Sequence, residues 1–308
     1  MDLRGNADYY FSRPNDQLDL TGSLAFSFLH RITPRMQFSA SASLSYLSQP
    51  DVRLVNGPSR NVGDYFSATS KFDLSYRWTK RFTTVTSFSL NSLLYSQAAQ
   101  QFGDYYEGVL GTEARYGWSP RLTLLADVRY GQISYPNNSL LNTHTLYLLL
   151  GGEYALSRQI STSLRLGESI RTFDESGGSS AAPYAEATAS WRYSPRGFLS
   201  LNSRFGFEES GSAETETQSL RVGLSATHAF SARLRGSMGV TYVHRTSTNE
   251  IANTDFAEQT FDFNLGFDYA FSKRMSFNGS YVFTTSTSDA EANDYYRNRI
   301  FLGVQYSF

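Results

Sequence analysis

A short motif recurs seven times along the chain and constrains its fold more than any other feature. Each copy consists of Ser or Thr, one further residue and then usually Arg, and successive copies lie about 40 residues apart. The copies begin at Thr33, Thr79, Ser119, Ser157, Ser194, Ser231 and Ser272. Because Ser and Thr hydroxyl groups hydrogen-bond to nearby backbone, the motif is typical of tight turns. The spacing predicts long β-hairpins, in which the chain runs down one strand and returns along the next.

Apolar and polar residues alternate between these turns. The final segment, RIFLGVQYSF, places Ile300, Leu302, Val304, Tyr306 and Phe308 on one face. In the segment 197–209 the apolar face carries Leu199, Leu201, Phe205 and Phe207. Alternation predicts strands with one apolar and one polar face. The apolar face would pack on a second sheet in a soluble β-sandwich, or contact lipid in an outer-membrane barrel whose polar face lines the lumen.

The two ends of the predicted hairpins differ, and this difference favours the barrel. Aromatic residues gather next to the short turns, at Trp78, Trp118, Trp191, Tyr193, Phe230 and Phe271. The opposite connections are longer and polar, at 48–64, 174–183, 247–255 and 286–294. Outer-membrane barrels have short periplasmic turns, longer extracellular loops and an aromatic girdle at the membrane interface. We expect the six aromatic residues to form the periplasmic girdle.

The sequence therefore predicts an all-β protein with one domain over residues 1–308. The expected fold is a membrane-spanning, closed, antiparallel up-and-down β-barrel of about sixteen strands, and fourteen or eighteen are possible. Segments 3–12 and 296–308 supply the first and last strands. Helical spanning is excluded because no run of 18 apolar residues occurs. The opening MDLRGNADYY is no signal peptide, so we expect a mature outer-membrane protein of a Gram-negative bacterium.

The phase of each strand assigns the charged residues of the lumen. The predicted pore-lining residues are Lys71, Asp73, Glu107, Glu113, Arg115, Asp127, Arg129, Glu153, Arg165, Arg192, Arg204, Arg221, Arg235, Asp262, Asp268 and Arg299. Arg77, Asp19, Glu186 and Glu208 share this phase. Arginines dominate between 160 and 247, and acids dominate on the three strands before. These charges either face open water and set a field across the pore, or pair between neighbouring strands and brace the wall.

Chemistry-bearing patterns are scarce. The four histidines lie at rims or on the lipid face by phase, and none combines with a Ser nucleophile and an acid, so we expect no enzyme. Cysteine is absent and the acidic loops lack EF-hand spacing, so neither a metal site nor a cofactor is expected. A net charge of -1 gives no reason to expect nucleic-acid binding. Gly151 and Gly152 are expected to mark a bulge or bend in the wall.

Basic residues accompany the turns and are expected to contact anionic phospholipid head groups. They are Arg35, Lys80, Arg81, Arg121, Arg158, Arg196, Arg233, Lys273 and Arg274.

The terminal Phe308, with Tyr306 and Val304 at alternate positions, resembles the C-terminal signature of Gram-negative outer-membrane proteins. This resemblance implies recognition by the barrel-assembly machinery. The Ser/Thr-Pro-Arg turns, the segment DQLDLTGSLAFSFLHRITPRMQFSASASLSY and the overall spacing resemble the putative β-barrel porins of the type 2 group. Membrane lipids, lipopolysaccharide and other envelope proteins are the further partners expected of such a barrel.

Two functions remain open at this point. The barrel is either a pore for passive diffusion of small polar solutes, or a structural subunit or anchor of a surface or secretion assembly, including polysaccharide export, whose lumen a partner fills. The loop 48–64 either folds inward as a constriction or lies outside.

Overall fold

The computed structural model describes residues 2–9, 18–47, 64–96, 101, 103–175, 177–208, 215–249, 254–272, 274–289 and 294–306. These residues form one antiparallel sheet of sixteen strands, and every strand pairs with its neighbours in sequence. A short 3-10 turn spans Ser139–Leu141. Within these ranges, no helix has the length and apolar character needed to cross a membrane. The prediction of an all-β, up-and-down antiparallel fold is confirmed.

The strands follow one another without crossovers. They are β1 (Asp2–Tyr9), β2 (Leu18–Thr33), β3 (Met36–Leu47), β4 (Tyr65–Arg77), β5 (Phe82–Tyr95), β6 (Tyr105–Gly117), β7 (Leu122–Ser134), β8 (Thr143–Ala155), β9 (Ile160–Phe173), β10 (Ser179–Ser194), β11 (Gly197–Glu208), β12 (Thr215–Ala229), β13 (Leu234–Asn249), β14 (Thr254–Ala270), β15 (Met275–Ser288) and β16 (Tyr295–Tyr306).

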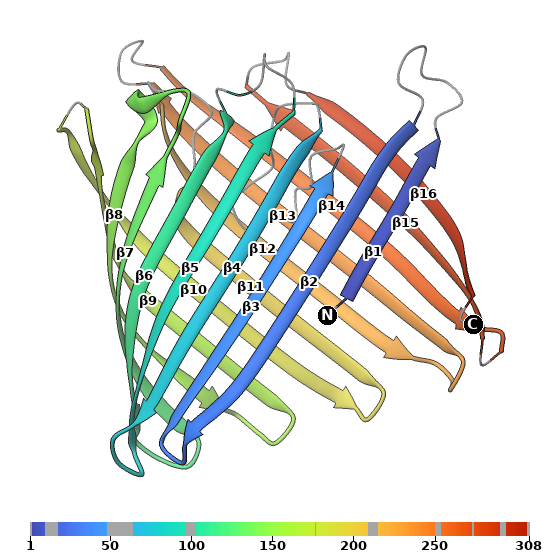
Figure 1. Ribbon diagram of the computed structural model, residues 1–308, viewed down its shortest axis with the longest axis horizontal. Coiled ribbons are helices and arrows are strands. Elements are labelled where there is room, and N and C mark those ends of the chain that lie inside the picture. The colour runs from blue at the N-terminus through green and yellow to red at the C-terminus, as the bar shows by residue number, and fades with distance from the viewer. Residues whose placement is uncertain are drawn as a thin grey trace.

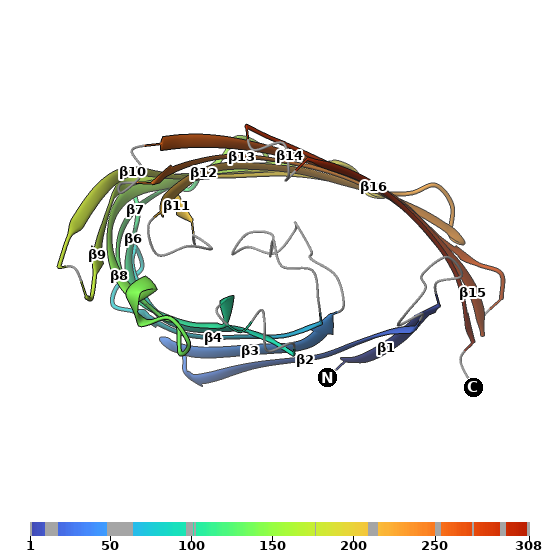
Figure 2. The ribbon, with the colours of Figure 1, turned by 90° about the horizontal axis from the view of Figure 1, so that it is seen from above.

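The sheet curves round on itself into a flattened ring (Figures 1 and 2). Seen from above, β2–β5 form one long wall, β11–β15 form the other, and β6–β10 make the sharp bend between them (Figure 2). Strands β1 and β16 are the two edges of the sheet, and no pairing joins them within the described residues. The observed sheet is therefore open between β1 and β16, and the predicted closure of the barrel is not seen in the strand pairing.

The seven Ser/Thr motifs form the turns that join β2 to β3, β4 to β5 and so on to β15, so all lie at one end of the sheet (Figure 1). In each turn the hydroxyl oxygen accepts a hydrogen bond from the backbone N–H two residues later, as Ser119 does from Arg121 at 3.2 Å. The same bond occurs at Thr33, Thr79, Ser157, Ser194, Ser231 and Ser272. The side chain thus replaces a missing backbone partner.

Connections at the other end are longer, for example 135–142 against 118–121. This agrees with the predicted asymmetry. The predicted loop 48–64 was expected to fold inward or to lie outside. Residues 48–63 lie outside the described residues, so this expectation stays a prediction. Asp64 is described, and its carboxylate accepts a hydrogen bond from the Tyr46 hydroxyl at 2.9 Å.

Two glycines allow the sharp bend. A Cβ atom on Gly167 of β9 would lie 1.9 Å from the backbone oxygen of Leu148, and one on Gly151 of β8 would lie 2.1 Å from that of Leu164. No side chain fits at such distances, so the two backbones approach closely only because both positions are Gly. The predicted bend near Gly151 is confirmed, although Gly167 contributes as much and Gly152 is less crowded.

The two faces of the sheet differ as the alternation predicts. Large apolar side chains on the outer face are highly exposed, including Leu150 at 70% and Leu302 at 75%. Small polar side chains such as Ser87 and Ser89 lie on the inner face, where they line a cavity. A soluble monomer does not expose so extensive an apolar surface.

Phe207 is an exception to the predicted phase. It was expected on the apolar outer face, but it is only 2% exposed, and the Arg171 guanidinium carbon lies 4.7 Å from its ring centre. The preceding Gly206 has φ of +156°, a backbone conformation that favours Gly. The regular alternation is interrupted there, and the ring packs against a cation instead.

Candidate functional site

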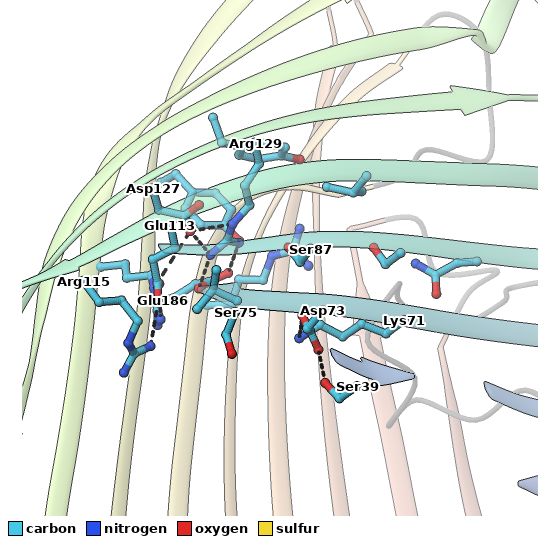
Figure 3. A pocket seen from close by; sticks show the side chains of 18 of the residues that line it. Ser39, Lys71, Asp73, Ser75, Ser87, Glu113, Arg115, Asp127, Arg129 and Glu186 are labelled. Carbon is cyan, nitrogen blue, oxygen red and sulfur yellow. Dashed lines mark hydrogen bonds and ion pairs between the residues drawn. The ribbon is translucent and has the colours of Figure 1, made fainter. Parts of the chain in front are cut away.

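The concave side of the bend holds a cavity of 680 Å³ (Figure 3). Its lining comes from nine consecutive strands, β3 to β11. Strands β3–β5 contribute mainly small polar groups, together with Lys71 and Asp73. The other strands contribute most of the charges, which are Glu107, Glu113, Arg115, Asp127, Arg129, Arg165, Glu186 and Arg204.

A network of ion pairs connects the charges at the bend. Arg129 on β7 lies 2.6 Å from Asp127 and donates to both carboxylate oxygens of Glu186 on β10, at 2.9 and 3.3 Å. Arg165 on β9 donates to Glu113 on β6 at 2.6 Å. Several pairs thus join strands that are not neighbours. The curvature explains this, because inward side chains converge on the concave side of a bent sheet.

Glu113 occupies the middle of a second chain of contacts. Its Oε1 accepts a hydrogen bond from Arg115 at 2.7 Å, while its Oε2 accepts from Arg165. Arg115 also donates to Glu153 on β8. Charge-assisted hydrogen bonds of this kind are stronger than neutral ones, and an arginine held by two acids has little rotational freedom. Of the two interpretations left open by the sequence, the geometry favours bracing of the wall for Arg115, Arg129 and Arg165, through strands two or three positions apart as well as within one strand.

Several of the other predicted pore-lining residues lie outside this cavity. Arg235 and Asp268 are register partners on β13 and β14 and line a separate cavity near the turns. Asp262 is buried farther along β14, where Thr284 donates to it at 2.8 Å. Arg192 is exposed near the turn end of β10.

Arg221 on β12 is the register partner of Arg204. On β16, Arg299 pairs in register with Val282. Lys71 and Asp73 form an ion pair of 3.3 Å on β4.

The sequence analysis missed several inner residues. Tyr147 and Tyr184 line the cavity, with ring centres 5.1 Å apart and ring planes inclined by 68° in an edge-to-face arrangement. Arg245 and Glu258 form a buried ion pair of 3.0 Å between β13 and β14. Their phase could have revealed them, since Arg245 follows Arg235 by an even number of residues. The tyrosines gave no such signal, because an aromatic residue in an alternating strand suggests the lipid face.

The predicted girdle residues are exposed at the turn end of the sheet, with Trp118 at 65% and Phe230 at 63%. Several of them contact a second aromatic ring, as Trp78 contacts Tyr76 with ring centres 4.6 Å apart. The His228 ring stacks on the Tyr193 ring. A hydrogen bond of 2.9 Å joins His228 Nδ1 to the Tyr193 hydroxyl oxygen. The basic turn residues are also exposed, apart from Lys273, which lies outside the described residues.

The predicted assembly signal is described only in part. Val304 lies on the outer face of β16 and is 62% exposed. Tyr306 ends β16 opposite Met275, and Phe308 lies outside the described residues.

The histidines are dispersed. The His144 ring nitrogen Nδ1 lies within hydrogen-bond distance, 2.8 Å, of the Asp174 carboxylate at the end opposite the short turns. His30 stacks on Phe28 near the first turn. Among the residues that the structure covers, no group of three or more His, Cys, Asp or Glu side chains is arranged to hold a metal ion.

Comparison with known proteins agrees with this architecture. A family model described as "Putative beta-barrel porin 2" matches residues 169–308, from within β9 to the end of the chain. This match is consistent with the resemblance seen in the sequence. No curated protein gives a significant match.

Two solved structures share the fold. The chain resembles the FrpB iron transporter from Neisseria meningitidis (F5-1 variant) with a TM-score of 0.52 and 5% identity, over 94% of this chain and 59% of the transporter. It resembles the ferric citrate transporter FecA in the unliganded form with a TM-score of 0.51 and 12% identity, over 93% and 55%. At these identities the likeness concerns the fold alone. The chain spans little more than half the length of either transporter.

Proposed function

We propose that this chain is a barrel of the Gram-negative outer membrane and acts as a pore for passive diffusion of small polar solutes. The observation that carries the proposal is the opposition of the two faces. An exposed apolar surface surrounds the outside, and a cavity of 680 Å³ with a polar, mixed-charge lining lies inside. Lipid on one side and water on the other satisfy both faces. The family match supports the same conclusion.

Closure of the barrel follows from the membrane. Unpaired backbone N–H and C=O groups cost several kcal/mol each in hydrocarbon, so a spanning sheet cannot keep open edges. Strands β1 and β16 form the two edges and face one another in Figure 2. We therefore propose that they pair in the membrane.

The wild-type chain contains no cysteine, which makes closure simple to test. Ala7→Cys in β1 would be combined in turn with Tyr296→Cys, Asn298→Cys and Ile300→Cys in β16. A disulfide requires Cα atoms about 4.4–6.8 Å apart, so one combination should crosslink in the outer membrane if the strands pair. Failure of the whole series to crosslink would contradict closure.

The ends of the barrel suggest its contacts. We propose that the aromatic girdle and the basic turn residues contact inner-leaflet phospholipid, that lipopolysaccharide surrounds the opposite end, and that Val304, Tyr306 and Phe308 engage the barrel-assembly machinery. Deletion of Phe308 should then lower the amount of heat-modifiable protein in the outer membrane.

Conductance in a planar lipid bilayer tests the pore directly. Purified wild-type protein should give discrete current steps in about 1 M KCl, where surface charge is screened to a few Å. Heat-denatured protein from the same preparation serves as the control. Folded, heat-modifiable protein that inserts without conducting would contradict the pore and favour a structural barrel filled by a partner.

A further inference from the structure

Arg204 on β11 differs from the other cations of the cavity. Each of the others forms an ion pair with a carboxylate; they are Lys71, Arg115, Arg129 and Arg165. Arg204 makes no direct ion pair or hydrogen bond with any residue in the described part of the chain, and its guanidinium carbon lies 5.6 Å from the centre of the Tyr184 ring. Its hydrogen-bond donors are therefore available inside the cavity.

The nearby acids are already engaged. Both carboxylate oxygens of Glu186 accept hydrogen bonds from Arg129, and Oε1 also accepts one from the Tyr184 hydroxyl. Glu107, the other acid that interacts with Arg204, accepts a hydrogen bond from the Asn91 side chain at 2.7 Å. Neither acid can turn to Arg204 without giving up a charge-assisted bond that it already makes.

The neighbour across the strand adds a second like charge. Arg221 on β12 is the register partner of Arg204, so two arginines occupy opposed positions on adjacent strands. Two positive charges in such positions attract an anion more strongly than one alone.

We propose that Arg204 anchors a binding site for small organic monocarboxylates within the lumen. The proposal rests on the pore function and specifies one class of solute for it. A guanidinium group presents its N–H donors in a planar fork that matches the two oxygens of a carboxylate. Tyr147 and Tyr184 offer two aromatic rings in an edge-to-face arrangement for the body of the ligand. The acids of the wall repel further negative charge, which favours a monoanion over a dianion such as hydrogen phosphate.

Benzoate is a suitable probe because it combines one carboxylate with a flat apolar ring. Added to a conducting wild-type channel, it should reduce the open-channel current in a saturable manner. Arg204→Gln should raise the half-blocking concentration at least about ten-fold, since it removes the charge and the donor fork. Arg204→Lys should give an intermediate value, because it keeps the charge alone. Arg235→Gln, which removes one inner positive charge at the separate cavity, should change it less than about two-fold.

Comparison of the Arg204→Gln and Arg235→Gln variants distinguishes a specific binding site at Arg204 from a general effect of positive charge on benzoate block. Equal shifts for the Arg204→Gln and Arg235→Gln variants would overturn the site, as would an unblocked wild-type channel. Stronger block by inorganic phosphate than by benzoate would overturn the assignment to organic monocarboxylates. If the wild-type protein does not conduct, the pore proposal fails, and calorimetric titration of the detergent-solubilised protein with benzoate tests the site alone. Binding that is lost in Arg204→Gln supports it, while no binding, or equal binding in both proteins, overturns it.

Discussion

The inner faces of β3–β5 and of β6–β10 line the same cavity but use different side chains. On β3–β5 the lining is mostly small and polar, with residues such as Ser39, Ser75 and Ser87, whereas β6–β10 supply interlocked acids and arginines (Figure 3). The wall of β2–β5 is long and gently curved, and β6–β10 make the bend (Figure 2). Where a wall is gently curved, inward side chains remain apart and small polar groups suffice. At a bend they converge, and charged side chains there pack together without repulsion only where their signs are complementary.

Among substitutions that test this difference between the two regions, a change at Gly167 in the bend should reduce stability the most. Gly167→Ala places a methyl group against the Leu148 backbone oxygen, so β8 and β9 must separate and the bend must open. We expect a loss of about 3 kcal/mol or more in the free energy of unfolding, measured by urea unfolding in lipid vesicles.

Gly108→Ala on β6 is the matched control. Its Cβ atom would meet the nearest atom, Leu90 Cδ2, at 3.6 Å, which is ordinary van der Waals contact. Its effect should stay within about 1 kcal/mol and can be stabilising, because Gly weakens a strand interior. Equal losses for the two substitutions would show that the bend has no special need for Gly167.

Removal of Arg129 should have the next largest effect. Arg129→Ala leaves Asp127, which is 5% exposed, and Glu186 without their shared cation. Breaking a buried pair costs about 3–5 kcal/mol, and partial exposure of this network reduces the expected loss to about 2 kcal/mol. Ser87→Ala on the gently curved wall should cost less than about 0.5 kcal/mol.

The double substitution Arg129→Gln with Glu186→Gln sharpens the test of the network. The double substitution removes both charges of one ion pair. It should therefore lower the free energy of unfolding less than Arg129→Gln does alone. If the two substitutions are simply additive in the same unfolding assay, the ion pair does not couple β7 to β10.

The smallest expected effect concerns Asp104, which lies between β5 and β6, where the two regions meet. Its carboxylate accepts a hydrogen bond from the Tyr95 backbone N–H at 2.7 Å, but burial outweighs that bond and raises the pKa of Asp104. A raised pKa in the folded state means that the protonated form is favoured there. The contribution of Asp104 to stability is therefore greatest at low pH and is lost as the pH rises through the folded-state pKa.

Asp104→Asn should remove this part of the pH dependence, since its amide oxygen can still accept the Tyr95 bond. Thermal unfolding of both proteins between pH 3 and pH 7 (roughly one unit below to three above the ordinary Asp pKa) measures the difference. A stability difference that does not change with pH would contradict the assignment. A larger stability of wild type at pH 7 than at pH 4, relative to the Asn variant, would reverse its sign.

The sequence by itself determined the strands, the end at which the tight turns lie and most of the inner and outer phase. These properties depend on neighbours in sequence: a hydroxyl two residues from an N–H group, and side chains that alternate along a strand. The lining positions of Glu113, Arg129 and Arg165 were accessible for the same reason.

Only the tertiary structure decided which of these charges meet. Alternation gives the face of a residue but not the curvature of the sheet, and the curvature brings β6 beside β9 and β7 beside β10 on the concave side. Gly151 marked the bend in the sequence, but its counterpart Gly167 became evident only from the approach of two backbones. The lack of a direct ion pair at Arg204 was equally inaccessible, because it depends on Glu186 of β10 and Glu107 of β6 being held by other side chains.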